Sequence, residues 1–109
     1  MSKIIGRFFF KQTTNGNLIG EFSNNSSTKN STESSDLLTP KNTFVGEYNS
    51  TWQDNGTAFF AKLFIEHKAN STEIYSLEWK RDNKIIFWGE GFICDGILIG
   101  DYRNFNPIS

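Results

Sequence analysis

Apolar and polar residues alternate with a period of two along most of this chain. In residues 59–68 one face carries Phe59, Ala61, Leu63 and Ile65, and in residues 74–81 one face carries Tyr75, Leu77 and Trp79. This spacing is typical of antiparallel strands with one buried face, and no segment carries the spacing of about 3.6 residues that marks an amphipathic helix. Asp, Asn and Gly stand at the breaks, where tight hairpins need them. The pattern predicts strands near residues 3–12, 16–23, 43–53, 57–68, 73–81, 84–94 and 96–103.

The connections between the predicted strands are short from the third strand onward, so strands that are neighbours in sequence are expected to be neighbours in the sheet. The predicted fold is therefore all-β: an antiparallel up-and-down meander of about seven strands that forms a strongly curved sheet or barrel. A chain of 109 residues fits one domain, residues 1–109. Residues 23–36 are almost all Ser, Asn, Thr or charged. We therefore expect a mobile loop over 23–38, because such a segment buries too little to offset its ordering entropy.

Three segments share the order apolar, β-branched, Gly, acid, aromatic; they are Leu18–Phe22, Phe44–Tyr48 and Leu98–Tyr102. The hairpin that contains the first resembles the hairpin that contains the last, which suggests an internal repeat. An inward glycine lets a strand bend or lets a large side chain pack over it, and we expect the aromatic residue two positions later to cover it. The acids of these segments are expected to face solvent. The alternative is that Glu21, Glu47 and Asp101 supply a catalytic carboxylate pair.

Strand phase divides the large side chains into two sets. The inner set is Phe8, Phe10, Phe22, Phe44, Tyr48, Trp52, Phe59, Leu63, Tyr75, Leu77, Trp79, Phe87 and Tyr102. The outer set is also apolar: Ile5, Phe9, Ile19, Val45, Phe60, Phe64, Ile86, Trp88, Phe92 and Ile99. A monomer rarely leaves so many large apolar groups in water.

We therefore expect a homo-oligomer, with a dimer favoured, whose interface on the outer sheet face includes Phe60, Phe64, Trp88 and Phe92. One alternative is that the loop covers part of this face. Another is a phase shift of one residue in some strands, which would exchange the two faces.

The amino-acid composition argues against nucleic-acid-binding and membrane-spanning functions. Eleven basic and twelve acidic residues give a net charge of −1, and no basic patch points to nucleic acid as a partner. No apolar run is long enough to span a membrane. The first residues carry no sustained apolar stretch and no small-residue cleavage site, so a cytoplasmic location is expected.

Few residues offer catalytic chemistry. One histidine, His67, and one cysteine, Cys94, exclude a Cys/His metal cluster and an internal disulfide, and we expect no metal and no cofactor. Cys94 is expected to be a small buried or half-buried apolar residue. No nucleophile motif or phosphate-binding glycine loop is present, so no catalytic residue is assigned. An enzyme acting on a ligand inside the barrel is the lesser alternative, with Tyr48, Tyr75 and His67 on its inner face.

Small-ligand binding ranks about level with assembly and above an enzymatic role, because the predicted inner face is lined with aromatic residues. Those of the inner set that carry a hydroxyl or an indole N–H are the candidate ligand-binding residues: Tyr48, Trp52, Tyr75, Trp79 and Tyr102. Small barrels with such linings hold one apolar or planar ligand, and each Tyr or Trp offers area plus one hydrogen bond. The alternative is that these side chains fill the interior completely.

The run Tyr75–Asn83, followed by Phe87–Phe92, resembles the central hairpin of calycin-type barrels, especially the avidin-like ones. Gly46-Glu47-Tyr48 resembles a Gly-x-Tyr strand of the same group. The resemblance implies a barrel that holds a small ligand, with Tyr75, Trp79 and Trp88 as the aromatic residues that face it.

Overall fold

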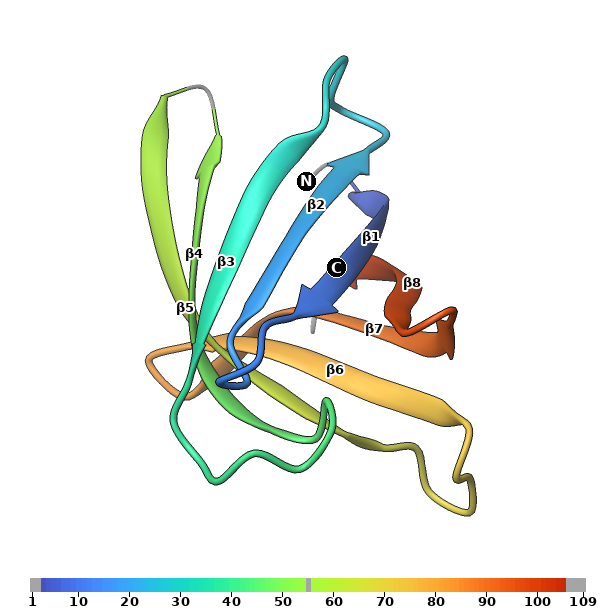
Figure 1. The fold of residues 1–109 in the computed structure, drawn as a ribbon. Helices are drawn as coiled ribbons and strands as arrows, with labels where there is room; N and C mark the ends of the chain where they lie inside the picture. The colour runs from blue at the N-terminus through green and yellow to red at the C-terminus, as the bar shows by residue number, and fades with distance from the viewer. Residues whose placement is uncertain (1–2, 55, 106–109) are drawn as a thin grey trace.

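The computed structural model describes residues 3–54 and 56–105, which form eight antiparallel strands in chain order (Figure 1). They are β1 (Ile5–Gln12), β2 (Leu18–Asn24), β3 (Ser31–Leu37), β4 (Gly46–Asp54), β5 (Thr57–His67), β6 (Ile74–Arg81), β7 (Lys84–Cys94) and β8 (Ile97–Asn104). Each strand pairs with the next, and β8 pairs with β1, so the sheet closes into a barrel within one chain. The predicted all-β meander is confirmed, with eight strands instead of about seven.

The additional strand lies in the segment that was expected to be a mobile loop, residues 23–38. Strand β2 continues to Asn24 and β3 occupies Ser31–Leu37, which leaves residues 25–30 as the connection. The loop prediction was therefore wrong for the second half of this segment. The physical reason is that β3 presents polar residues to the interior, Glu33 and Ser35, so the strand has no apolar alternation to detect.

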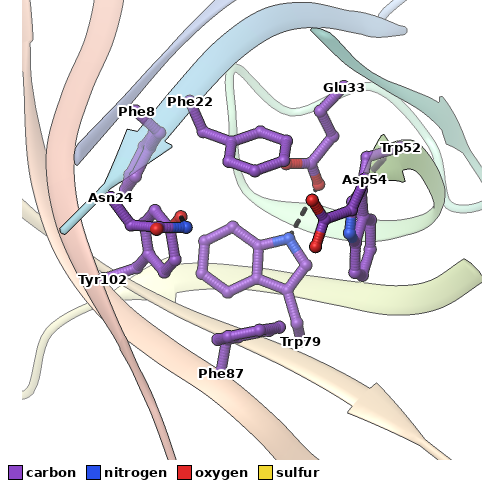
Figure 2. Close-up of a pocket in the computed structure, with 9 residues that line it drawn as sticks. All are labelled: Phe8, Phe22, Asn24, Glu33, Trp52, Asp54, Trp79, Phe87 and Tyr102. Atoms are coloured by element: carbon purple, nitrogen blue, oxygen red, sulfur yellow. Dashed lines mark hydrogen bonds between the residues drawn. The ribbon is translucent and has the colours of Figure 1, made fainter. Parts of the chain in front are cut away.

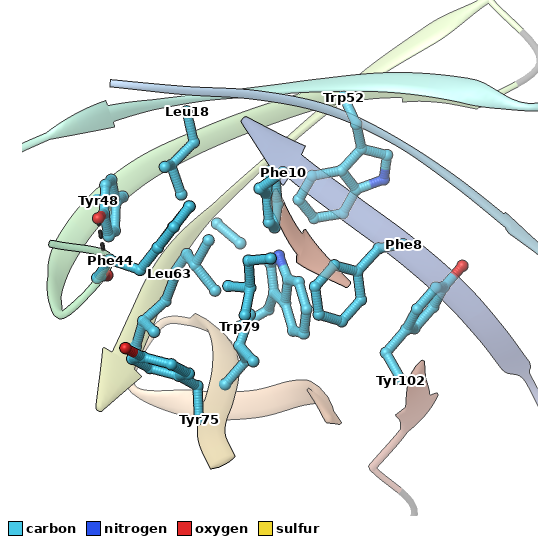
Figure 3. Packing of buried hydrophobic residues seen from close by; sticks show 14 residues of the cluster. Phe8, Phe10, Leu18, Phe44, Tyr48, Trp52, Leu63, Tyr75, Trp79 and Tyr102 are labelled. Carbon is cyan, nitrogen blue, oxygen red and sulfur yellow. Dashed lines mark hydrogen bonds between the residues drawn. The ribbon is translucent and has the colours of Figure 1, made fainter. Parts of the chain in front are cut away.

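The interior is a packed core of mainly aromatic and branched side chains (Figure 3). Its buried apolar members are Phe8, Phe10, Leu18, Phe44, Tyr48, Trp52, Ala61, Leu63, Ile65, Tyr75, Leu77, Trp79, Leu98 and Tyr102. The remaining residues of the predicted inner set, Phe22, Phe59 and Phe87, pack against this core and are half-buried. The inward phase deduced from the alternation is confirmed at the positions of that set that lie on strands, whereas Phe44 reaches the core from the connection between β3 and β4.

The two ends of the barrel differ. At one end the connection between β3 and β4, residues 38–45, inserts the ring of Phe44 into the core. The Tyr48 hydroxyl donates to the Phe44 carbonyl at 2.8 Å, and the Phe44 ring meets the edge of Tyr75 at 6.5 Å. This connection lies below the barrel in Figure 1 and closes that end. The opposite end carries the hairpin connections β2–β3, β4–β5 and β6–β7.

Inward glycines face aromatic rings on the neighbouring strands. Phe10 lies opposite Gly20, and Phe8 lies opposite Gly100. A Cβ atom at Gly20 would lie 2.7 Å from Cδ1 of Phe10, and one at Gly100 would lie 2.8 Å from Cζ of Phe8. The rings that cover Gly20 and Gly100 therefore come from the adjacent strand, not from two positions later. The residue directly opposite is about 5 Å away, whereas the position two residues along a strand is about 7 Å away. At Gly46 the ring two positions later does lie nearby, because a Cβ atom there would be 3.8 Å from Cε1 of Tyr48.

Because the space beside Gly100 is occupied by the Phe8 ring and by the Glu90 carbonyl, we expect Gly100→Ala to lower the free energy of unfolding by about 1–3 kcal/mol. Urea denaturation followed by circular dichroism measures this. Asp101→Ala is the control, since Asp101 is exposed on the same strand and the change is expected to stay within about 0.5 kcal/mol. Equal losses in the two variants would contradict the steric origin.

Candidate functional site

A pocket of about 60 Å³ lies inside the end of the barrel opposite Phe44 (Figure 2). Its lining comprises Phe8, Phe22, Asn24, Glu33, Trp52, Asp54, Trp79, Phe87 and Tyr102. A buried water needs about 10–15 Å³ on this measure, and pockets for drug-sized ligands span about 300–1,000 Å³. Side chains therefore fill most of the interior, and the remaining space fits one small group.

The aromatic walls hold one another in place. Trp52 stacks on Phe59 with ring centroids 6.1 Å apart, and it meets the edge of Phe87 at 6.3 Å. Trp79 packs edge-on against Phe8 at 5.8 Å and lies tilted against Tyr102 at 6.0 Å. Such edge and offset contacts fix ring orientations, so the pocket is preformed without a ligand.

A β-bulge lies beside the pocket between β6 and β7. Trp79 pairs with Phe87, but the next residue, Lys80, pairs with Ile85, so Ile86 has no partner on β6. The Ile86 carbonyl instead accepts the backbone N–H of Phe105 at 2.9 Å. Bulges re-aim the side chains next to them. Here the bulge adjoins two rings of the pocket wall.

Glu33 on β3 is the buried acid of the pocket, with only 4% of the residue exposed. Its Oε2 accepts the indole N–H of Trp79 at 2.8 Å and the hydroxyl of Ser50. Ser50 is itself hydrogen-bonded to Ser35 at 2.8 Å, across the β3–β4 register. Within the described residues, no hydrogen bond reaches the other oxygen, Oε1. The carboxyl is thus held through one oxygen, and the other is available to the pocket.

Burial raises the pKa of Glu33 to about 7, and the hydrogen bonds from Ser50 and Trp79 oppose this rise. Near neutral pH the pocket therefore contains both the acid and the carboxylate. Oε2 already accepts two donors, so the proton of the acid form belongs on Oε1. The same atom can offer the pocket a hydrogen-bond donor or a negative charge.

Two further polar groups line the pocket near its mouth. The Asn24 side-chain amide donates to the Tyr102 hydroxyl at 2.9 Å, while burial raises the pKa of this phenol. Asp54 is exposed at the end of β4. Within the described part of the chain, no Lys, Arg or His belongs to the lining.

The five predicted ligand-binding residues divide between the two ends of the barrel. Trp52, Trp79 and Tyr102 line the pocket. Tyr48 and Tyr75 do not, because they pack around Phe44 at the closed end. Burial raises the pKa of Tyr48 to about 12, which keeps its hydroxyl protonated.

Sequence reasoning missed Asn24 and Glu33, which lie in the segment expected to be a loop, and also Asp54. One signal was available. The predicted strands left a connection of roughly 20 residues, and a structureless loop of that length argues against the element assignment in a compact domain. A further strand between residues 24 and 42 was the better interpretation.

The residues of the enzymatic alternatives lie outside the pocket. His67 is exposed at the end of β5, with its ring 4.7 Å from that of Tyr75. Glu21 and Asp101 are exposed on the outer face, and Glu47 is half-buried with an oxygen 3.5 Å from Lys62 Nζ. Cys94 is exposed next to the β7–β8 turn, so the expectation that it is buried was wrong. Cys94 is the last residue of β7 and therefore lies past the part of the strand that packs on the core.

The four predicted interface residues all lie on the outer face. Phe60 is 65% exposed and Phe92 54% exposed. Phe64 and Trp88 are half-buried, because Lys80 Nζ lies 4.9 Å from the centre of the Phe64 ring and the Arg103 guanidinium lies 4.5 Å from that of Trp88. Trp88 therefore does not face the pocket, which corrects the role that the calycin resemblance implied for it.

Among residues 3–54 and 56–105, no cluster of His, Cys, Asp and Glu side chains is arranged to hold a metal ion. The same residues include no helix that is long and apolar enough to cross a membrane. No protein-family model matches the chain, and neither a curated protein nor a solved structure matches it.

The raised pKa of Glu33 makes stability depend on pH. A folded-state pKa above the unfolded value of about 4.5 means that stability is fully present below pH 4.5 and is lost as pH rises through about 7. Glu33→Gln keeps an acceptor for Trp79 and Ser50 but does not titrate. Between pH 5.5 and pH 8 the free energy of unfolding of the wild type should therefore fall by about 2 kcal/mol more than that of Glu33→Gln.

Urea denaturation of both proteins at the two pH values measures this difference. Glu47→Gln is the control, because that side chain lies on the outer face. A wild-type profile parallel to that of Glu33→Gln would contradict the placement of Glu33 in the core.

Proposed function

We propose that this protein is a small-ligand-binding β-barrel that takes one small apolar or aromatic group into the pocket beside Trp79. The observation that carries the proposal is the lining, since six of its nine residues are aromatic. The pocket lies at the end of the barrel that no inserted segment of residues 3–54 and 56–105 closes. Aromatic walls bury a planar group on both faces, and the few polar atoms orient it.

The size of the pocket limits what enters it. A space of about 60 Å³ corresponds to a few water molecules on the same measure, which suits one ring or a short branched chain. Any larger ligand would place one end in the pocket and leave the rest at the mouth, near Asn24 and Asp54. A relationship to calycin-type barrels and a cytoplasmic location both stay predictions.

The chain contains its own reporters for this proposal. Trp52 and Trp79 line the pocket, whereas Trp88 lies on the outer face. On titration with benzyl alcohol or phenol at millimolar concentration, the indole N–H signals of Trp52 and Trp79 should shift in a ¹H–¹⁵N spectrum, and that of Trp88 should not. Trp52→Phe should weaken binding by about tenfold, through lost contact area, while Tyr75→Phe, at the closed end, should leave it unchanged.

Absence of shifts at both pocket indoles for every small aromatic compound tested would refute the proposal. So would shifts confined to Trp88, because they would place the compounds on the outer face. Native mass spectrometry of gently purified protein is an independent readout, in which a bound adduct supports the pocket.

A second candidate is assembly of a homodimer through the outer face. It is favoured by a row of apolar side chains in register across four strands: Ile74, Phe92, Ile99 and Phe9. The Trp88 ring is already covered by the Arg103 guanidinium, so it offers less apolar surface to a second subunit. No cation covers Phe92 within the described chain.

Light scattering at micromolar concentration tests the assembly. We expect a dimer that Phe92→Asp dissociates, because the change puts a charge in the centre of the row. Leu38→Asp, at an exposed apolar residue of the β3–β4 connection outside the row, is the control and should leave the mass unchanged. A strictly monomeric wild type would rule the candidate out.

A further inference from the structure

The pocket contains an acid whose charge no described residue neutralises. Glu33 is buried, takes part in no ion pair of the described residues, and is hydrogen-bonded only by the neutral groups of Trp79 and Ser50. A buried carboxylate is stabilised most effectively by a cation in direct contact. The lining contains a second acid, Asp54, and no basic side chain. The charge distribution of the pocket therefore favours a positively charged occupant.

The aromatic walls favour the same chemistry. The faces of Trp and Tyr rings attract cations, with energies that rise when the site is shielded from water. Trp52, Trp79 and Tyr102 line the same pocket as Glu33 (Figure 2). An alkylammonium or protonated benzylamine-type group would contact these rings through its carbon atoms and would donate an N–H to Oε1 of Glu33.

We infer that the ligand of this pocket is a small primary or secondary amine, bound as its cation with the ammonium group on Glu33 and the attached ring or chain against Trp52, Trp79 and Tyr102. This inference rests on the proposed function, since it names the class of ligand that the same pocket takes. It excludes small carboxylates and phosphates, which two acids would repel.

Cation binding must be coupled to the protonation of Glu33. Its pKa lies at about 7 in the free protein, so binding a cation below that pH releases a proton, and affinity should rise with pH until about 7. The charged or titratable groups on the neighbouring elements are few. Asp54 comes from β4 and Tyr102 from β8, while the position opposite Glu33 on β2 is Gly20. Burial raises the pKa of Tyr102, so its hydroxyl stays protonated between pH 5.5 and 8. The charge of Arg7 on β1 lowers the pKa of Tyr102, as the smallest of the contributions to it.

The test compares three ligands of nearly equal shape and different charge: benzylamine, benzyl alcohol and benzoate. Calorimetric titration at pH 7.5 should give an affinity for benzylamine at least tenfold higher than for benzyl alcohol, and no detectable binding of benzoate. Between pH 5.5 and 7 the affinity for benzylamine should rise by more than tenfold, with up to one proton released. The affinity for benzyl alcohol should change by less than threefold.

Three variants assign the effect to individual carboxyl groups. Glu33→Gln should remove both the preference for benzylamine and its pH dependence while benzyl alcohol still binds. Asp54→Asn should lower the affinity for benzylamine by only a few-fold, because the exposed charge of Asp54 is screened by solvent. Glu47→Gln, an outer-face carboxylate, should have no effect.

The outcomes separate the inference from the proposed function. Equal affinity for benzylamine and benzyl alcohol would overturn the amine inference and leave a pocket for small aromatic groups. No binding of either compound, with unshifted Trp52 and Trp79 signals, would overturn both. If Glu33→Gln does not fold, the ligand series and the pH profile of the wild type still decide, because both depend on the charge of Glu33.

Discussion

Closure of the sheet by the pairing of β8 with β1 is the constraint on which the rest of this structure depends. It gives every strand two neighbours and leaves no exposed sheet edge. It also confines the large inward side chains of eight short strands to a narrow interior. Gly20 lies opposite Phe10 and Gly100 lies opposite Phe8, so each of these two inward rings of β1 has a glycine beside it on one neighbouring strand. Ring size and glycine position are therefore matched across strands.

The packing is dense everywhere except near one end, and this difference gives the barrel its polarity. Phe44 enters the closed end from a connecting segment and brings Tyr48 and Tyr75 together around it. The opposite end receives no inserted side chain from the described connections. The space that remains there lies between Trp52, Trp79 and Tyr102. A candidate site thus results from unequal filling of a single core.

Glu33 is the one buried acidic residue among those the structure describes, and its burial has an energetic cost. Removing a carboxylate from water is unfavourable unless hydrogen bonds or a cation compensate, and here two neutral donors supply part of the compensation. The chain from Ser35 through Ser50 to Glu33 also joins β3 to β4 inside the barrel, where apolar side chains would otherwise make the contact. A residue that lowers stability in the free protein is well suited to bind a ligand of opposite charge, because the ligand recovers part of that energy.

The alternation of residues along the chain determined the strand class, the meander order and the division into inner and outer faces, because a strand has a period of two whatever surrounds it. It identified Trp52, Trp79 and Tyr102 as inward residues. The alternation could not identify β3, since that strand turns Glu33 and Ser35 inward and shows no contrast between its faces. Nor could it separate Tyr48 from Trp52, which have the same phase on β4 but lie toward opposite ends of the barrel. Only the tertiary structure decided which inward residues meet, because barrel closure and the insertion of Phe44 depend on contacts between residues far apart in the sequence.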